Sequence, residues 1–356
     1  MLIGLSQYRI GAILAYITLK SLKERNVVAK QNPYRPFTPN PELMALWPDN
    51  ISGNAINGVG ETEVRKPDIV WWATENDTSS FADMQQWFYR HEPKDETLMA
   101  LRRKRRDIID APLPDLAYTA ADKTPDEWTG ELGRFVDKGV CEKVGVTKLR
   151  QEWVYTHHRT EFKNVLLLGV AHDFEELITA PTLQAGIEVT HQYCRAASAA
   201  KEVASWLRYQ GWDAEPVTGP MVGKILMIPH ALEAGFGELG KHGSLITPEF
   251  GSAFRLGAVL TNAPFAPSQK VTHGINDFCL NCRVCEDACP PVAIQPEKKM
   301  VRGEKRWSVD FDKCIPFFAE TSGCAICIAV CPWSRPGVGP KLTEKLAQRA
   351  ERLDKG

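Results

Sequence analysis

The chain has 356 residues, 44% of them hydrophobic, which is enough for a full core and for two or three domains. The charges of the basic and acidic residues nearly cancel, and the formal net charge of −1 does not indicate a basic face of the kind that binds nucleic acid. We therefore expect no nucleic-acid partner.

The first predicted element is an apolar helix at residues 2–19. Arg9 interrupts the apolar run, and Lys20, Lys23 and Arg25 follow it. A membrane-spanning helix needs about 20 uninterrupted apolar residues, and this segment shows neither an Ala-x-Ala cleavage site nor a twin-Arg pair. We predict an amphipathic helix that packs on the body of the protein or on a second subunit, so a homodimer is left open. A weak membrane-surface anchor is the alternative.

Residues 1–150 are predicted to form an N-terminal region that is extended and then helical. Residues 30–70 are rich in Pro, Asn and Gly, which is typical of an extended surface segment, and residues 78–150 read mostly as helix. The basic run at residues 102–106 is predicted to be a solvated helix face. A further set recurs at helical spacing and is expected in the core: Trp128, Leu132 and Val136.

A compact α/β unit is predicted over residues 151–267. Residues 165–170 form a continuous apolar run, as in a buried strand. Residues 183–210 predict a long helix whose small and apolar side chains share one face. We then expect, in order, a strand at 213–217, a second helix, a glycine-rich loop and a strand at 256–261.

The glycine-rich loop Gly235-Phe-Gly237-Glu-Leu-Gly240 matches a dinucleotide-binding fingerprint letter by letter. That fingerprint must follow a strand and open a helix, whereas residues 229–234 read as a helix that leads into the glycines. We therefore reject a nicotinamide site. We predict instead that glycine allows the loop backbone to approach a large flat cofactor.

Eight of the ten cysteines lie in two arrays that end in Cys-Pro, within a domain predicted over residues 268–340. The first array has the spacing Cys-x2-Cys-x2-Cys-x3-Cys-Pro of bacterial ferredoxins, in which the fourth Cys binds the other of two 4Fe–4S clusters. The second array has the spacing Cys-x9-Cys-x2-Cys-x3-Cys-Pro. This rule predicts one cluster bound by Cys279, Cys282, Cys285 and Cys331, and another bound by Cys289, Cys314, Cys324 and Cys327.

Zinc and disulfides are the alternatives for these cysteines. Zinc also binds Cys pairs two residues apart, but three Cys at successive x2 spacings suit the face of a cube better than a tetrahedron. Disulfides are typical of small secreted domains, and this sequence is long and shows no secretory signal. Thiols must stay reduced while clusters assemble, which favours the cytoplasm.

The second array has nine residues in its first gap, where a ferredoxin has two. We predict that residues 315–323 fold out as a loop and that Phe317 and Phe318 pack this loop over a cluster. A short charged helix within residues 341–356 is the last predicted element.

Residues 228–264 carry a family resemblance in the segment IPHALEAGFGELGKHGSLITPEFGSAFRLGAVLTNAP. The Ala180-Pro181 pair, the helix from Tyr193 to Trp212 and both Cys arrays are similar too. Over residues 150–335 the chain resembles the reductive dehalogenases and the related epoxyqueuosine reductases. The resemblance implies an α+β protein with a nitroreductase-like α/β core that binds a cobalamin without a protein His ligand, followed by a ferredoxin-like domain with two 4Fe–4S clusters.

The resemblance also implies functional residues. Tyr193 matches the family's proton donor, and Arg255 is the expected supporting cation, because a cation beside a Tyr hydroxyl favours proton release. The ordinary alternatives are a buried helix Tyr and a salt-bridged surface Arg; Lys241 and His242 are alternatives for the cation. Corrinoid contacts are expected in the glycine loop from Gly235, Gly237, Glu238, Gly240, Lys241, His242, Ser244 and Leu245.

We predict a cytoplasmic, corrinoid-dependent reductive dehalogenase that reduces a carbon–halogen bond of a small organohalide, for which an aromatic compound fits. Val217 stands where epoxyqueuosine reductases carry an acid in a Val-Asp-Thr-Gly-Pro segment, and the sequence ends soon after Cys331; both favour the dehalogenase-like branch. With no flavin module in the sequence, a separate ferredoxin, flavodoxin or reductase would donate electrons. The alternatives are an epoxyqueuosine-type reductase acting on transfer RNA, a non-catalytic electron-transfer or corrinoid protein, and a family member with a non-halogen substrate.

Overall fold

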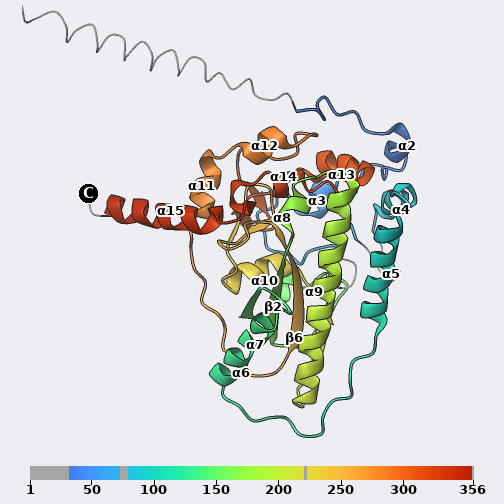
Figure 1. Cartoon of the computed structure of the whole chain (residues 1–356). Coiled ribbons are helices and arrows are strands. Elements are labelled where there is room, and N and C mark those ends of the chain that lie inside the picture. The colour runs from blue at the N-terminus through green and yellow to red at the C-terminus, as the bar shows by residue number, and fades with distance from the viewer. Residues whose placement is uncertain (1–31, 73–78, 220–222, 355–356) are drawn as a thin grey trace, which may run out of the picture. The chain divides into compact units, whose positions relative to one another are not determined.

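The computed structural model describes residues 32–72, 79–219 and 223–354 (Figure 1). The chain divides into two units, Met1–Pro36 and Phe37–Gly356, and the second carries the sheet and both Cys arrays. The amphipathic helix predicted at residues 2–19 lies outside the described residues. Within the described ranges, no helix combines the length and the apolar character needed to cross a membrane.

The core of the second unit is a four-stranded antiparallel sheet with the order β1-β2-β6-β3. Its strands are β1 (Lys143–Lys148), β2 (Asn164–Ala171), β3 (Ala214–Val217) and β6 (Phe254–Thr261). The buried strand predicted at residues 165–170 is confirmed, because both faces of β2 are covered by other elements. The structure places β1 before the boundary at residue 150 that the sequence predicts, and pairs it with β2.

The long helix α9 (Leu183–Tyr209) packs across one face of the sheet, and its predicted apolar face is buried. A Cβ at Gly257 of β6 would come within 2.7 Å of the Ala196 carbonyl oxygen, so glycine allows helix and strand to approach closely. The same face is covered by α6 (Pro125–Glu131) and α7 (Gly133–Asp137), and Trp128 and Leu132 join this core as predicted.

Helix α5 (Glu96–Asp110) lies beside α9 (Figure 1). The prediction that the basic run of residues 102–106 is a solvated face is correct only in part. Arg103, Lys104 and Arg106 are exposed, but the guanidinium of Arg105 lies 5.6 Å from the ring centre of Tyr193. Arg102 pairs with the buried carboxylate of Glu92. Packing of α5 on α9 turns part of the basic run inward.

The opposite face of the sheet is covered by α10 (Met227–Glu233), the glycine loop, and the short pair β4 (Glu238–Leu239) and β5 (Leu245–Ile246). Phe236 is fully buried there against the sheet. Because α10 runs into the glycines, the context required for a dinucleotide fingerprint is missing, as the sequence indicates.

The Cys arrays lie on short elements that follow β6. These are α11 (Ile275–Asn281), α12 (Val284–Ala288), the hairpin β7 (Lys299–Val301) and β8 (Glu304–Arg306), α13 (Phe311–Glu320), α14 (Ile326–Ala329), a 3-10 turn (Pro332–Ser334) and α15 (Val338–Asp354). The loop predicted at residues 315–323 is wrong for most of that range. Asp310 caps α13 by accepting from the Lys313 N–H at 3.3 Å, and the buried side chains of α13 anchor its inner face.

Phe318 of α13 packs against Trp71, Trp72 and Phe88 rather than over a cluster. These aromatic residues form one core with the N-terminal segment of the unit. That segment and the remaining connections hold α2 (Pro41–Met44), α3 (Gly53–Ile56), α4 (Ala82–His91), a 3-10 turn (Gln151–Trp153) and α8 (Phe174–Leu177). Residues of the second unit between Leu43 and Tyr89 are thus packed directly on the Cys-bearing domain.

Candidate functional site

The thiols of the two arrays fall into two sets, and most of the charge effects between thiols occur within a set. The pKa of Cys285 is raised to about 12 by burial and by the charges of Cys331, Cys279 and Cys282. That of Cys314 is raised to about 12 by burial and by Cys324, Cys289 and Asp310. Cys331 thus lies near thiols of the first array and Cys289 near thiols of the second, and Cys285 also acts on Cys327. The crossed ligand set stays a prediction.

Burial keeps Cys285, Cys314, Cys324 and Cys331 protonated when no iron is bound. It raises the pKa of Cys324 to about 11 and that of Cys331 to about 12. Positively charged iron would have to displace these protons, since the thiolate is the ligand. The sulfur atoms that bind a four-iron cube lie further from one another than the ligand atoms of a single metal ion. Among the described residues, no three His, Cys, Asp or Glu side chains lie close enough to hold one metal ion.

A buried ion pair lies beside the first thiol set. Lys241 is 2% exposed and pairs with Glu286, next to Cys285. The Lys241 charge, with a hydrogen bond from its backbone, opposes the rise that burial causes in the pKa of Cys279. Lys241 therefore stabilises negative charge at the predicted first cluster.

A cavity of about 330 Å³, here called the tyrosine cavity, opens between the sheet, α9 and the N-terminal segment. Tyr193 and Arg255 both line it. The Arg255 guanidinium carbon lies 5.0 Å from the Tyr193 ring centre, and that of Arg105 lies 5.6 Å from it. The structure therefore brings the two predicted catalytic residues together and adds a second cation that the sequence does not indicate.

The loop after β3 closes this arrangement. Gly219 has φ +109°, and a Cβ there would lie 3.6 Å from both the Tyr193 ring and the Arg105 Nη2. Arg105 Nη2 also donates to the Thr218 carbonyl oxygen at 3.5 Å. Val217, in the position where epoxyqueuosine reductases carry an acid, is buried and lines the cavity with its apolar side chain.

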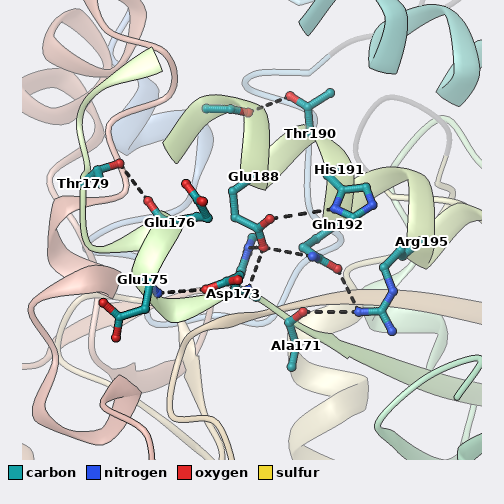
Figure 2. A network of polar contacts seen from close by, with 12 residues as sticks. Ala171, Asp173, Glu175, Glu176, Thr179, Glu188, Thr190, His191, Gln192 and Arg195 are labelled. Carbon is teal, nitrogen blue, oxygen red and sulfur yellow. Dashed lines mark hydrogen bonds and ion pairs between the residues drawn. The ribbon is translucent and has the colours of Figure 1, made fainter. Parts of the chain in front are cut away.

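A polar network holds the first half of α9 to the end of β2 (Figure 2). The buried carboxylate of Glu188, five residues before Tyr193, accepts from the Asp173 N–H at 2.8 Å and from Gln192 Nε2 at 2.9 Å. The His172 Nδ1 lies 3.1 Å from the same oxygen. Burial raises the pKa of Glu188, but these hydrogen bonds outweigh it and leave the carboxyl ionised.

His172 connects this network to Arg255. Burial, together with the positive charge of Arg255, lowers the pKa of His172 to about 4, against the hydrogen bond that the ring makes to Glu188. The ring is therefore neutral, and its Nδ1–H donates to Glu188. Among the described residues, the Arg255 Nε–H is buried without a hydrogen-bond partner.

A second cavity of about 400 Å³, here called the cluster cavity, is lined by Cys289, Cys314, Cys324 and Cys327. It shares Leu226 and Ile228 with the tyrosine cavity, so one short segment before and within α10 separates the two. Phe317 lines the cluster cavity.

Three of the eight residues predicted to contact a corrinoid line these cavities: His242 in the cluster cavity, and Ser244 and Leu245 in the tyrosine cavity. His242 is buried and neutral, with its pKa lowered to about 4 by burial. Its Nδ1 accepts from the Ser244 N–H at 3.2 Å, and its Nε2 lies 3.1 Å from the Ser252 hydroxyl oxygen. These contacts fix the loop at the boundary between the cavities.

The other predicted contact residues have roles within the protein. A Cβ at Gly235 would lie 2.3 Å from the Gln269 carbonyl oxygen, and one at Gly237 would lie 1.9 Å from that of Ile246. Gly240 packs against the Ile246 side chain, and Glu238 accepts N–H groups at the start of α11. The glycines thus allow protein backbone to approach protein backbone, a reason for glycine that needs no cofactor.

Comparisons with known proteins agree with this geometry. Residues 278–334 match the 4Fe–4S dicluster domain, which confirms the character of the Cys-bearing region. The tetrachloroethene reductive dehalogenase of Desulfitobacterium hafniense is 29% identical over 321 residues, which make up 82% of this chain and 56% of that protein. This chain is similar to the reductive dehalogenases. It spans about half the length of the curated relatives it matches.

The dehalogenase likeness extends to the fold. A solved structure of a catabolic reductive dehalogenase in complex with 3-bromo-4-hydroxybenzoic acid has a TM-score of 0.64 at 23% identity, covering 73% of this chain and 40% of that one. The epoxyqueuosine reductase of Bacillus anthracis is 37% identical, but over 115 residues, or 28% of this chain. The predicted resemblance to the reductive dehalogenases is confirmed, and the likeness to epoxyqueuosine reductases is local.

Sequence reasoning missed several residues in and around the tyrosine cavity. Arg105 is hidden in a basic run that looks like a solvated face. Glu188 and His172 carry no spacing signal, because their partners come from separate elements. The aromatic wall of the tyrosine cavity comes from the N-terminal segment, where composition suggests only an extended surface: Ile69, Trp71 and Trp72.

Proposed function

We propose that this chain is a corrinoid-dependent reductive dehalogenase, an oxidoreductase that reduces a carbon–halogen bond of a small organohalide. The observation that carries the proposal is the position of Tyr193 between two guanidinium groups, at the wall of a cavity that adjoins the predicted cluster ligands. Electrons would pass through two 4Fe–4S clusters, one on Cys279, Cys282, Cys285 and Cys331 and the other on Cys289, Cys314, Cys324 and Cys327.

The residues present fit a corrinoid. Two adjoining cavities give space for a flat ring and a tail, and their shared wall includes Leu226 and Ile228. Ser244 and Leu245 would meet the ring from the glycine loop, and Arg255 lines the same space. When bound, the corrinoid supplies a cobalt centre that stores single electrons at low potential for the reduction. We include in the proposal that the sheet and α9 form a nitroreductase-like core.

The protein's own part in the chemistry is to deliver a proton and to stabilise charge. Cleavage of the carbon–halogen bond leaves an electron-rich carbon, and we assign the Tyr193 hydroxyl as the donor of the proton that this carbon takes up. Arg255 and Arg105 stabilise the negative charge left on the Tyr oxygen, and they act strongly because the site is partly shielded from water. Glu188 and His172 position α9 and the surroundings of Arg255, and do not touch the substrate.

The walls of the tyrosine cavity support an aromatic substrate. Trp71, Trp72 and Tyr155 line it, and flat side chains favour flat ligands through stacked or edge contacts. A catabolic dehalogenase of similar fold is solved with 3-bromo-4-hydroxybenzoic acid, whereas several of the curated relatives are tetrachloroethene dehalogenases. We propose a halogenated aromatic ring as the substrate of this chain.

The partners and location belong to the same proposal. A separate ferredoxin, flavodoxin or reductase would reduce the clusters, and the reduced thiols that assembly requires favour the cytoplasm. An epoxyqueuosine-type activity is disfavoured by Val217, whose buried apolar side chain cannot transfer a proton.

The test uses full-length protein prepared without oxygen and loaded with cobalamin. Visible and EPR spectra should show both corrinoid and iron–sulfur signals, and a reduced viologen should drive halide release from a bromophenol faster than from tetrachloroethene. Faster chloride release from tetrachloroethene would replace the aromatic substrate. Iron without any bound corrinoid, or a loaded protein that releases no halide, would leave only an electron-transfer role.

A further inference from the structure

Residues 52–72, here called the strap, contribute walls to both cavities. Asn57 and Val59 line the cluster cavity, whereas Trp71 and Trp72 line the tyrosine cavity. The strap belongs to neither Cys array and takes no part in the proton transfer proposed above. Whatever holds the strap in place therefore affects both sites at once.

The first end of the strap is fastened to helix α13 by one carboxylate. Asp312 accepts from the Ser52 hydroxyl at 2.6 Å and from the Gly53 N–H at 2.8 Å. A longer bond, from the Asn54 N–H, measures 3.4 Å. Both N–H groups lie in the first turn of the short helix α3, where N–H groups lack partners within the helix. The carboxylate thus caps α3 from a distant element, and hydrogen bonds to a carboxylate are stronger than those between neutral groups.

A reciprocal pair of hydrogen bonds reinforces this contact. The Asn54 Nδ2 donates to Asp310 at 2.8 Å, and the Phe311 N–H donates to the Asn54 Oδ1 at 2.8 Å. A Cβ at Gly53 would lie 2.0 Å from the Phe311 ring, so glycine allows the strap to approach α13 closely. The strap and the first turn of α13 therefore pack as one unit.

Arg65 holds the two halves of the strap together. Its Nη2 donates to the Ile56 carbonyl oxygen at 2.8 Å, and its guanidinium pairs with Glu61 and with Asp68, each at 2.8 Å. These contacts join the part of the strap near α3 to the part that leads into Trp71. A displacement of either half should therefore move the other.

The second end of the strap also meets α13. The ring centre of Phe318 lies 6.4 Å from that of Trp71 and 5.9 Å from that of Trp72. Between Asp312 and Phe318, the same helix carries Cys314, a predicted ligand of the second cluster. Iron bound at Cys314 would therefore fix the helix to which both ends of the strap are attached.

We propose that Asp312 is a positioning residue that couples the second predicted cluster to the wall of the substrate site, because it fastens the strap to the helix that carries Cys314. The inference rests on the function proposed above and concerns how its site is assembled. Iron binding at Cys314 and attachment of the strap favour the same position of α13, so each strengthens the other. The first predicted cluster takes its ligands from outside α13 and lies outside this coupling.

The first test measures amide hydrogen exchange in the strap of full-length protein loaded with iron and cobalamin without oxygen. Cys314→Ala removes a ligand of the second cluster, and Cys282→Ala removes one of the first. In the Cys314 variant, we expect peptides of residues 53–72 to exchange about 10-fold faster than in the wild type, a typical size for a coupling between two sites. In the Cys282 variant they should exchange at the wild-type rate. Equal exchange in all three proteins, or an equal rise in both variants, would overturn the proposal.

The second test measures how fast a chelator removes iron, followed through the EPR signal of each cluster. Asp312→Ala should lose the second-cluster signal about 10-fold faster than the wild type, as expected for charge-assisted hydrogen bonds, and should keep the first signal. Asp287→Ala is the matched control. Asp287 also lies two residues before a second-cluster ligand, Cys289, but its side chain is 69% exposed, so both signals should persist. Asn54→Ala, which leaves the Cys-bearing domain unchanged, should reproduce the effect of Asp312→Ala.

Other outcomes would contradict the coupling. Faster loss of both signals in the Asp312 variant, or the same loss in the Asp287 variant, would reduce the role of Asp312 to general stability of the domain. An effect of Asp312→Ala without one of Asn54→Ala would confine that role to the surroundings of Cys314. A protein that loads iron but no corrinoid would remove the proposed function, while both tests would still decide the coupling. A protein that loads no iron would remove both.

Discussion

The Cys-bearing domain and the tyrosine cavity are assembled in different ways. The first takes its predicted ligands from two arrays, residues 279–289 and 314–331, each held by short local helices. The tyrosine cavity takes its lining from segments as far apart as Ile69 and Leu256. A change in an array should therefore remove one cluster and leave the sheet in place. A substitution at a residue behind the lining of the tyrosine cavity should lower the reaction rate indirectly, because it shifts the lining residues that the substituted residue supports.

The strongest test of this contrast lies in the crossed ligand pattern. Cys282→Ala and Cys331→Ala should each lose about half of the iron and all halide release, and their remaining EPR signals should be the same. Cys289→Ala should lose the other cluster and leave a different signal. The buried Cys141 lies outside the arrays, so Cys141→Ala should keep the full iron content. A Cys331 variant whose spectrum matches that of the Cys289 variant would contradict the crossing.

The next test removes the proton donor while leaving the cavity intact. Tyr193→Phe should lower kcat by roughly 100-fold, the usual contribution of a positioned acid, and should leave cobalamin affinity unchanged. Tyr209→Phe, at the exposed end of the same helix, should have no effect. Turnover equal to the wild type in both variants would exclude Tyr193 from the mechanism.

A subtler test changes the loop that closes over Tyr193. Gly219→Ala should cost about 1 kcal/mol of folding free energy because φ is positive there, and should lower kcat by about tenfold as Tyr193 and Arg105 shift. Gly139 also has a positive φ but open space around it, so Gly139→Ala should lose stability and keep kcat. Urea unfolding and halide release measure the two effects. Equal activity in both variants would mean that the loop does not position the site.

The smallest expected effect concerns the free energy of unfolding at acid pH. It depends on His230, which is buried in the core beside the tyrosine cavity. The His230 Nδ1 donates to the Leu226 carbonyl oxygen at 2.7 Å and its Nε2 accepts from the Arg150 N–H at 3.3 Å, so the ring is neutral. Burial lowers its pKa from 6.5 to about 4. As pH falls through this window, the unfolded chain binds the proton first, so stability present above pH 6.5 is lost toward pH 4.

His230→Phe should reduce that loss by about 1 kcal/mol, because one protonation linked to unfolding is removed. Anaerobic urea unfolding of both proteins at several pH values measures the difference, and the acid lability of the clusters is common to both. Parallel stability curves from pH 7 to about pH 4.5 would show that His230 does not titrate on unfolding.

The accuracy of the sequence predictions follows the same contrast between the two regions. The Cys spacing, the buried strand of residues 165–170 and the helix of residues 183–210 depend on local periodicity, and the structure contains the strand and the helix. Residues 315–323 were predicted as a loop from a gap length alone, and α13 replaces most of it because its apolar side chains find a partner in the N-terminal aromatic core. The glycine loop was predicted to contact a cofactor, whereas Gly235 and Gly237 contact protein backbone.

Ligand spacing in the sequence determined the iron–sulfur character of the Cys-bearing domain, and helix periodicity located the long helix, because both patterns are local. The similarity to reductive dehalogenases, and Tyr193 and Arg255 as candidates, came from the resemblance over residues 150–335. Only the tertiary structure decided that Arg105 turns inward, that Glu188 and His172 support the site, and that Asp312 fastens the strap to α13. Each of these depends on which distant segments meet, and that is set by packing across the sheet and not by any pattern along the chain.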